Sequence, residues 1–355
     1  MNRPTLHDSV SDPRPTGKPP LVSVVIVNYN AWPDVLALVA ALASSAEVEA
    51  GLCEVVVVDN ASDGPAPDEL LAPTIGVRLV FRDENGGFAV GVNAGWRRAK
   101  GRWLLLINPD VVADEGLLGR IVERVRRYED DPQGAPGIVG FGLRNPDGTR
   151  QPSVGTFPNL GRTVWEQLIP RSRRKYQAVW RTRPGPVSWV TGACVIINGA
   201  LLEFPGGLDE DFFLYYEEVA LCRSARRQGW RVEYDPSVEV VHLRPLQNRP
   251  VTPRMRVITR HSKLLYFRKH LPRWQFLGLC VVVAAESRVL GALARACGRI
   301  EEARGWRTVA RIEQTLRSGV ELVGRDVLTL ADAVAQTRPE QQRPTARQRA
   351  LRQKH

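Results

Sequence analysis

The sequence predicts an α/β protein: a doubly wound half-domain, followed by a C-terminal helical region. Two observations lead to this prediction. Short apolar runs rich in β-branched residues alternate with amphipathic segments through residue 108, as expected for strands covered by helices on both faces. From residue 257 onward the pattern is helical.

The first half of the chain has a regular order of elements. Phe88, Val92 and Trp96 share one side of its second helix, so this segment is amphipathic. The expected strands are 21–27, 54–60, 77–82 and 102–108, and the expected helices are 33–43 and 88–99.

After residue 132 the alternation of strand and helix patterns becomes less regular. A strand and a Pro-Asp-Gly turn are expected near 138–148, and a strand with a kink at Gly192 is expected over 187–198. A helix starting at Glu217 should end at Gly229, which favours a C-terminal stop. Two further strands are expected, over 231–236 and 238–243.

The composition is that of a globular protein with room for one large domain and an appendage. The chain has 355 residues, of which 43% are hydrophobic and 25% charged. Its five cysteines are scattered without a C-x-x-C pair, which argues against a zinc site or disulfide framework and fits a reducing compartment. The N-terminus lacks the apolar core of a signal peptide, so we expect a cytoplasmic protein.

The positive charge is concentrated in three segments. The chain carries +11, but 171–183, 244–274 and 336–355 together carry +20, which leaves −9 for the rest. Basic patches on an acidic body fit anionic lipid or a phosphorylated lipid substrate, although a solvated basic face remains an alternative. Because the chain has no nucleic-acid recognition motif, we expect no nucleic-acid partner.

The most apolar segment is 274–298. It is interrupted by Glu286, Ser287 and Arg288, so no uninterrupted run reaches the roughly 18 to 20 residues of a spanning helix. Basic and aromatic residues precede it, which favours a helix lying in the membrane interface. The alternative is a helix packed on the rest of the chain or on another subunit, which would make the protein a homo-oligomer.

Polar residues follow the predicted strands. Asn28 ends the first strand, Asp59 and Asn60 the second, and Asn108 and Asp110 follow the last. In open α/β sheets, ligands bind at the carboxyl ends of strands. The chain lacks G-x-G-x-x-G after the first strand and has no P-loop. A bound diphosphate would therefore need a divalent cation, with Asp110 as a candidate ligand held by a turn that Pro109 makes rigid.

Six motifs in order resemble inverting family 2 glycosyltransferases, specifically the bacterial rhamnosyltransferase branch. They are VSVVIVNYN, VVVVDNASDG, ENGGFAVGVNAG, LLLINPD, VTGACVIIN and FFLYYEEVALCRSARRQGW. The resemblance covers about residues 21–242 and implies an A-type glycosyltransferase fold, with a Rossmann-like nucleotide-binding half and a mixed sheet. It divides the chain into a flexible arm (1–20), a catalytic domain (21–245), a helical region expected to associate with membrane (246–335) and a basic disordered tail (336–355).

The resemblance implies a donor site. Asp59 matches the acid that recognises the nucleoside, with Asn28 and Asn60 beside it. The segment with Asn85, Gly87 and Asn93 matches the lining of the nucleotide-sugar pocket, where a missing side chain lets the backbone approach the ligand.

It also implies a site for Mg²⁺ or Mn²⁺. Asp110 matches the last carboxylate of the Asp-x-Asp metal motif, and Asn108 replaces the first. His242 matches a histidine near the metal or diphosphate, although it is as readily a structural histidine. The small residues that often follow are replaced by Leu243, Arg244 and Pro245.

The general base is expected at the start of the later helix. Glu218 aligns with the base and Glu217 precedes it, whereas Ala220 stands where a further carboxylate is usual. A different interpretation is that the two glutamates only favour a helix N-terminus. By the same resemblance, Trp189, Thr191 and Gly192 line the acceptor side.

These features predict an enzyme of cell-envelope polysaccharide synthesis at the inner face of the membrane. It would transfer, with inversion, a deoxyhexose such as rhamnose from a dTDP- or UDP-type donor to a lipid-linked acceptor. The alternative is a nucleotide-sugar-binding partner that has lost catalysis, since Glu218 and Ala220 depart from the usual pattern.

Overall fold

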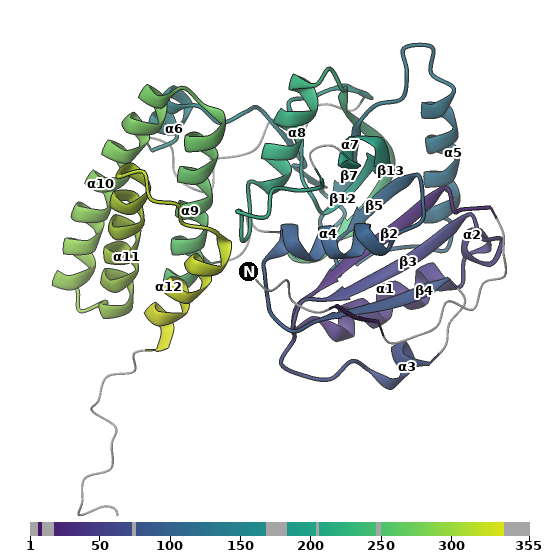
Figure 1. The fold of residues 1–355 in the computed structure, drawn as a ribbon, viewed down its shortest axis with the longest axis horizontal. Coiled ribbons are helices and arrows are strands. Elements are labelled where there is room, and N and C mark those ends of the chain that lie inside the picture. Colours follow the sequence, from purple (N-terminus) through teal and green to yellow (C-terminus); the bar gives the residue numbers. More distant parts are fainter. Residues whose placement is uncertain are drawn as a thin grey trace, which may run out of the picture.

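An α/β domain and a helical domain lie side by side in the computed structural model (Figure 1). The structure describes residues 6–8, 18–72, 76–167, 183–203, 206–245 and 250–336. The expected disordered tail, apart from Gln336, and most of the basic run at 171–183 lie outside these residues.

Four parallel strands form the first half of the sheet, in the order β4-β3-β2-β5. Each predicted strand and helix of this half is confirmed, and two short helices, α2 and α3, are added. The elements are β2 (Val22–Asn28), α1 (Trp32–Ala43), α2 (Ala46–Glu49), β3 (Cys53–Asp59), α3 (Asp68–Leu71), β4 (Val77–Arg82), α4 (Phe88–Arg98) and β5 (Trp103–Ile107).

The second half makes the sheet mixed, as predicted. β12 (Cys194–Asn198) lies antiparallel between β5 and β7 (Ile138–Arg144), and β13 (Val232–His242) runs parallel to β7. β13 joins the two strands expected at 231–236 and 238–243 through an irregularity between Asp235 and Glu239. The remaining elements of this half are β6 (Val111–Val112), α5 (Leu117–Glu129), β8 (Arg150–Gln151), β9 (Val154–Gly155), β10 (Gly185–Pro186), β11 (Trp189–Val190), α7 (Gly199–Glu203) and α8 (Glu217–Arg227).

Two predictions were wrong in detail. The segment 187–198 is not one kinked strand, because β11 pairs with β9 in a separate two-stranded sheet before β12 joins the main sheet. The arm 1–20 is not wholly unstructured, because β1 (Leu6–Asp8) pairs antiparallel with β4. Backbone pairing at a sheet edge needs no apolar side-chain pattern, so no pattern in the residues indicates this strand.

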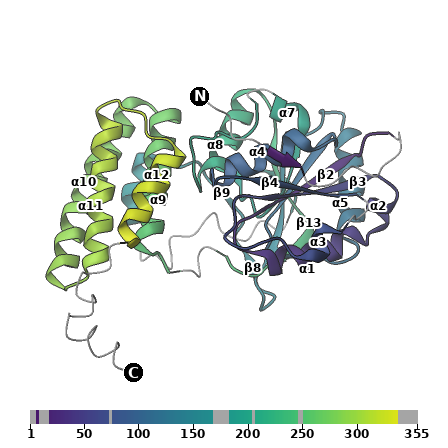
Figure 2. The same cartoon turned by 60° about the horizontal axis from the view of Figure 1, so that its bottom comes forward.

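The sheet separates two apolar cores because alternate residues of a strand point to opposite faces. Val24 and Ile26 of β2 face the core under α1 and α5, whereas Val25 and Val27 face the core under α4 and α8. Figure 2 views the sheet nearly edge-on, with α4 on one side and α1 and α3 on the other. The second core continues into the helical domain, so the two domains share one apolar interior.

The predicted helical region consists of four helices, against which α6 (Leu160–Gln167) also packs. They are α9 (Pro253–His270), α10 (Arg273–Ala296), α11 (Ile300–Arg317) and α12 (Gly324–Gln336). Among the described residues, α10 is the one helix whose length and composition would allow it to cross a membrane. Glu286, which interrupts its apolar run, is paired with Arg260 of α9.

Candidate active site

A pocket of about 500 Å³ opens at the carboxyl ends of β2 and β5. Two walls of this pocket carry polar side chains that were predicted as site residues. The sheet wall consists of Asn108, Asp110 and His242, and the loop wall consists of Glu217 and Glu218. Five of the predicted site residues, far apart in the sequence, therefore face one cavity. Thr191 and Gly192, expected on the acceptor side, also line it, whereas Trp189 does not.

The turn after β5 places Asp110 as the sequence predicts. The amide of Asn108 donates to the Ala193 carbonyl, and the amide of Val111 donates back to the Asn108 carbonyl, closing a turn with Pro109 in its second position. The amide of Leu243 donates to the Asp110 carbonyl. Asp110 is buried, so its carboxylate is fixed at the pocket floor.

His242 ends β13 and meets Asp110. Its Nε2 lies 3.2 Å from Asp110 Oδ1, and its Nδ1 lies 2.9 Å from the side-chain nitrogen of Gln151. Both side chains of the His–Asp pair are less than a tenth exposed. The sheet therefore brings together the two residues that the sequence proposes as metal ligands.

The sheet wall fits a divalent cation in part. Among the described residues, no group of three or more His, Cys, Asp or Glu side chains is arranged so that it could hold a metal ion. However, Asp110 and His242 offer one oxygen and one nitrogen donor, and buried His242 Nε2 makes no hydrogen bond. Mg²⁺ commonly takes one or two protein ligands and completes its shell with phosphate and water.

Asn28 and Asp59 meet in the layer behind the pocket. They are neighbours in the register of β2 and β3, and Asn28 Nδ2 donates to Asp59 Oδ1 over 2.8 Å. Ser62 binds both Asp59 oxygens, through its hydroxyl and its amide. The structure thus groups the expected nucleoside residues but fixes them in a network of their own beside the pocket lining.

Asn60, Asn85 and Gly87 link this network to the loop wall. Asn60 Nδ2 donates to Asn85 Oδ1 and to the Gly87 carbonyl. Gly87 has φ of +93°, and a Cβ there would lie 2.3 Å from the Phe213 carbonyl oxygen. The close approach that requires glycine is therefore to the chain leading into Glu217, rather than to a ligand.

Asn93 is separated from the pocket. Its side chain donates to the Leu208 carbonyl and to Glu210, and accepts from the Leu208 amide. It lines a second, smaller cavity between α4 and the 206–210 segment. Asn93 ties that segment to α4, and the structure gives it no place in the nucleotide-sugar pocket expected for it.

Glu217 and Glu218 begin α8 after an unusual turn. Tyr215 and Tyr216 both have positive φ, at 69° and 73°, a conformation that costs free energy for non-glycine residues. One carboxylate oxygen of each glutamate is buried without a hydrogen-bond partner among the described residues. Within the described part of the chain, each glutamate therefore has one buried oxygen without a partner in addition to its hydrogen bonds with backbone amides.

Burial raises the pKa of both glutamates. For Glu217 the nearby charge of Glu218 adds to the effect of burial and raises the pKa well above the usual value. For Glu218 burial is the main cause, opposed by first-turn backbone amides, and its pKa rises to about 7. Such a value suits a group that accepts a proton near neutral pH.

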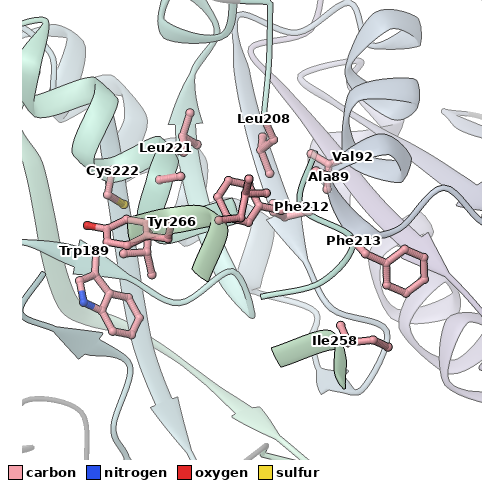
Figure 3. Close-up of a cluster of buried hydrophobic side chains, with 14 of the residues drawn as sticks. Ala89, Val92, Trp189, Leu208, Phe212, Phe213, Leu221, Cys222, Ile258 and Tyr266 are labelled. Carbon is pink, nitrogen blue, oxygen red and sulfur yellow. The ribbon is translucent and has the colours of Figure 1, made fainter. Parts of the chain in front are cut away.

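Helix α9 holds the loop before Glu217 from the other side. Ser262 Oγ donates to the Leu214 carbonyl over 2.8 Å, and the Tyr266 ring packs on Tyr216 with centroids 5.4 Å apart. Figure 3 shows Tyr266 in the same apolar cluster as Phe212 and Phe213 of this loop. The helical domain is thus part of the support of the site.

Asp34, Gln151 and Arg244 are among the residues that line the pocket without having been predicted as site residues. Arg244 had a sequence signal, since it replaces a small residue two positions after His242. Gln151 and Asp34 had none, because only the fold brings them to the sheet wall.

Comparison with known proteins finds a glycosyltransferase family model and two rhamnosyltransferases among the relatives. Residues 23–201, half of the chain, match the family model described as Glycosyl transferase family 2. The N-acetylglucosaminyl-diphospho-decaprenol L-rhamnosyltransferase of Mycobacterium tuberculosis is 27% identical over 240 residues, covering 62% of this chain and 76% of that protein. The rhamnosyltransferase WbbL of Escherichia coli is 22% identical over 166 residues, covering 46% of this chain and 61% of that protein.

Among solved structures, the mannosyltransferase PcManGT from Pyrobaculum calidifontis, in complex with GDP-Man and Mn²⁺, has a TM-score of 0.46 to this chain. It is 18% identical, and the match covers 89% of this chain and 86% of that one.

Proposed function

Because this chain belongs to glycosyl transferase family 2 and is rhamnosyltransferase-like, we propose that it transfers a deoxyhexose such as rhamnose, with inversion. The donor is a dTDP- or UDP-sugar and the acceptor is a lipid-linked saccharide of the cell envelope. The name of the mycobacterial relative, which specifies a diphospho-decaprenol acceptor, supports this acceptor class.

One observation carries the proposal: a single pocket holds both the Asp110–His242 pair and two glutamates with buried, unpartnered oxygens. Glycosyl transfer with inversion needs a group that takes the acceptor proton and positive charge near the departing diphosphate. In this proposal the loop wall supplies the group that takes the proton, and the sheet wall holds the positive charge.

Glu218 is the general base in this proposal. Its raised pKa of about 7 leaves a substantial fraction ionised at neutral pH, while making the carboxylate more basic than an exposed glutamate. Glu217 is more deeply buried, and burial together with the charge of Glu218 raises its pKa, which favours its protonated form and limits the negative charge beside Glu218.

Asp110 and His242 would hold Mg²⁺ or Mn²⁺, with Asn108 in the same wall. The bound cation supplies positive charge that stabilises the diphosphate as it leaves. Asn28, Asp59, Asn60 and Asn85 shape the nucleoside side from behind the pocket.

The acceptor reaches the protein at the membrane surface. Large apolar side chains are exposed along α10, and Trp165 of α6 is also exposed. We name the α10 residues the apolar stripe; they are Trp274, Leu277, Val281, Val289, Leu290 and Leu293. Exposed Arg273, Arg288, Arg295 and Arg299 lie on or beside the same helix, which favours an anionic lipid surface at the cytoplasmic face of the membrane.

Vesicle sedimentation tests this surface. Val281→Glu should weaken binding to phosphatidylglycerol vesicles about tenfold, since Val281 is 70% exposed and would otherwise bury an apolar side chain in lipid. Val320→Glu, at a similarly exposed valine outside the stripe, is the control. If Val281→Glu instead breaks up an oligomer and leaves vesicle binding unchanged, the stripe contacts a second copy of the chain.

The alternative function is a nucleotide-sugar-binding partner without catalysis. It is favoured by Ala220, which is buried in the apolar core where a further carboxylate would be expected. Incubation with dTDP-rhamnose and a polyprenyl-diphosphate saccharide separates the two functions. Transfer with inverted anomeric configuration, read by NMR, supports the enzyme, whereas donor binding with no product from any deoxyhexose nucleotide supports the partner.

A further inference from the structure

Arg244 places a positive charge on the rim of the pocket. It follows β13 by two residues and pairs with Asp34 in the first turn of α1. Its Nε also lies 3.6 Å from Asp110 Oδ2. The Arg244 side chain is about half exposed, whereas Asp110 is buried beneath it. Among the described residues that line the pocket, no other lysine or arginine occurs.

The Asp110 carboxylate consequently has a side-chain nitrogen near each of its two oxygens. His242 approaches Oδ1, and Arg244 approaches Oδ2. A cation bound at Asp110 would repel the nearby guanidinium, because like charges a few ångströms apart in a partly buried site repel strongly. Asp34 offers Arg244 a second carboxylate, so the guanidinium can leave Asp110 and remain at the pocket rim.

We propose that Arg244 binds the diphosphate of the donor, and that Asp34 keeps it in position when a cation occupies Asp110. This inference rests on the proposed function, since it assumes a nucleoside diphosphate in this pocket. A guanidinium presents parallel N–H donors that match phosphate oxygens, and it remains charged at every relevant pH. Arg244 is thereby a donor-binding residue that adds to the charge on the departing diphosphate.

The arrangement predicts that removing the Arg244 guanidinium changes the affinities for Mn²⁺ and for nucleoside diphosphates in opposite directions. Without the guanidinium, Asp110 is more available, so Mn²⁺ alone should bind more tightly. The diphosphate loses a charged partner, so nucleoside diphosphates should bind less tightly. A residue that only supported the fold would weaken both.

Calorimetric titration of the full chain tests this prediction. With Mn²⁺ alone, Arg244→Gln should lower the Kd about threefold or more. With saturating Mn²⁺, the same variant should raise the Kd of UDP or dTDP, whichever binds, about tenfold, and change the Kd of uridine or thymidine less than about twofold. Arg244→Lys should lie between wild type and Arg244→Gln, because a lysine is a point charge without the forked geometry.

Arg120→Gln is the matched control. Arg120 is an exposed arginine paired with Asp114 outside the pocket, and its removal should leave each of these Kd values unchanged. Equal Kd values for the diphosphate in wild type and Arg244→Gln would overturn the Arg244 proposal and leave the donor site standing. If wild type binds neither UDP nor dTDP, the donor site itself is wrong and the Arg244 proposal falls with it.

Discussion

The two walls of the pocket are held in place in different ways. Asp110 and His242 of the sheet wall stand at the ends of β5 and β13, on strands buried within one sheet. Glu217 and Glu218 of the loop wall follow two residues with positive φ, on a loop held between Gly87 and helix α9. Strand pairing alone positions the side chains of the sheet wall, whereas those of the loop wall are positioned by contacts from both domains.

The helical domain therefore has two roles. It offers an apolar stripe to its surroundings, and through Ser262 and Tyr266 it also supports the segment that positions the proposed base. Changes in the sheet wall should therefore act on binding of the donor and cation, and changes in the helical domain should act on turnover.

The largest effect is expected from Asp110→Ala, which removes the carboxylate of the sheet wall. In a thermal-shift panel of nucleoside diphosphates with and without Mn²⁺, wild type should gain about 2.7 kcal/mol at a hundredfold excess over Kd. The variant should lose the Mn²⁺-dependent part of that gain. A full Mn²⁺-dependent shift in Asp110→Ala would remove the cation from the sheet wall.

Gly87→Ala should damage the loop wall while leaving the sheet wall intact. The new Cβ would collide with the Phe213 carbonyl, and the backbone has a φ that alanine adopts poorly. We expect kcat to fall about tenfold to a hundredfold, as for small displacements of catalytic groups. Gly64→Ala, at a glycine with no heavy atom near its added Cβ, is the control. Unchanged kcat in Gly87→Ala would separate the glycine loop from catalysis.

The free energy of unfolding should depend on pH through Glu218 of the loop wall. Because burial raises the pKa of Glu218 from 4.5 to about 7, the folded state binds its proton more tightly than the unfolded state. This contribution is present below about pH 4.5 and is lost as pH rises through about 7. It should amount to about 3 kcal/mol between these values, given about 1.4 kcal/mol per pKa unit.

Buried His261 and partly buried His270 act in the opposite direction over part of this range, because desolvation lowers the pKa of each to about 4. The quantity to measure is therefore the difference between wild type and Glu218→Gln in urea unfolding at pH 5 and pH 8. An identical pH slope in both proteins would contradict the raised pKa.

The smallest effect is expected from Ser262→Ala, which removes one hydrogen bond between α9 and the loop. The free energy of unfolding should fall by about 1 kcal/mol, and kcat should fall by less than about threefold. Ser318→Ala is the control, because the Ser318 hydroxyl is exposed and bonds only within its own helix end. A decrease in kcat as large as that of Gly87→Ala would mean that α9 controls the loop more strongly than the glycine does.

The sequence predicted the sheet wall well and the loop wall only in part. Asp110 and His242 end strands, and strand ends can be read from apolar runs, so their meeting follows from topology. Gly87 and Asn93 were predicted to line the nucleotide-sugar pocket, but the structure gives Gly87 a close backbone contact and Asn93 hydrogen bonds to another loop. A missing side chain has the same appearance in a sequence whether it makes room for a ligand or for another part of the chain.

The support from α9 had no sequence signal. Ser262 and Tyr266 lie some 45 residues beyond the glutamates on a helix of mixed polarity, and only the packed structure shows that they touch residues 214 and 216. Long-range contacts between domains depend on surface shape, which no local pattern contains.

The most direct test of the central claim compares wild type with Glu218→Gln at pH 7.5, measuring both donor binding and sugar transfer. If Glu218 is the base, the variant binds the donor nucleotide with unchanged Kd, and kcat falls by about 10²-fold to 10⁴-fold. Glu217→Gln should keep most of its activity, because Glu217 is not the base in this account and its raised pKa favours the neutral form that glutamine mimics. Full transfer by Glu218→Gln would contradict the account and move the base elsewhere in the pocket.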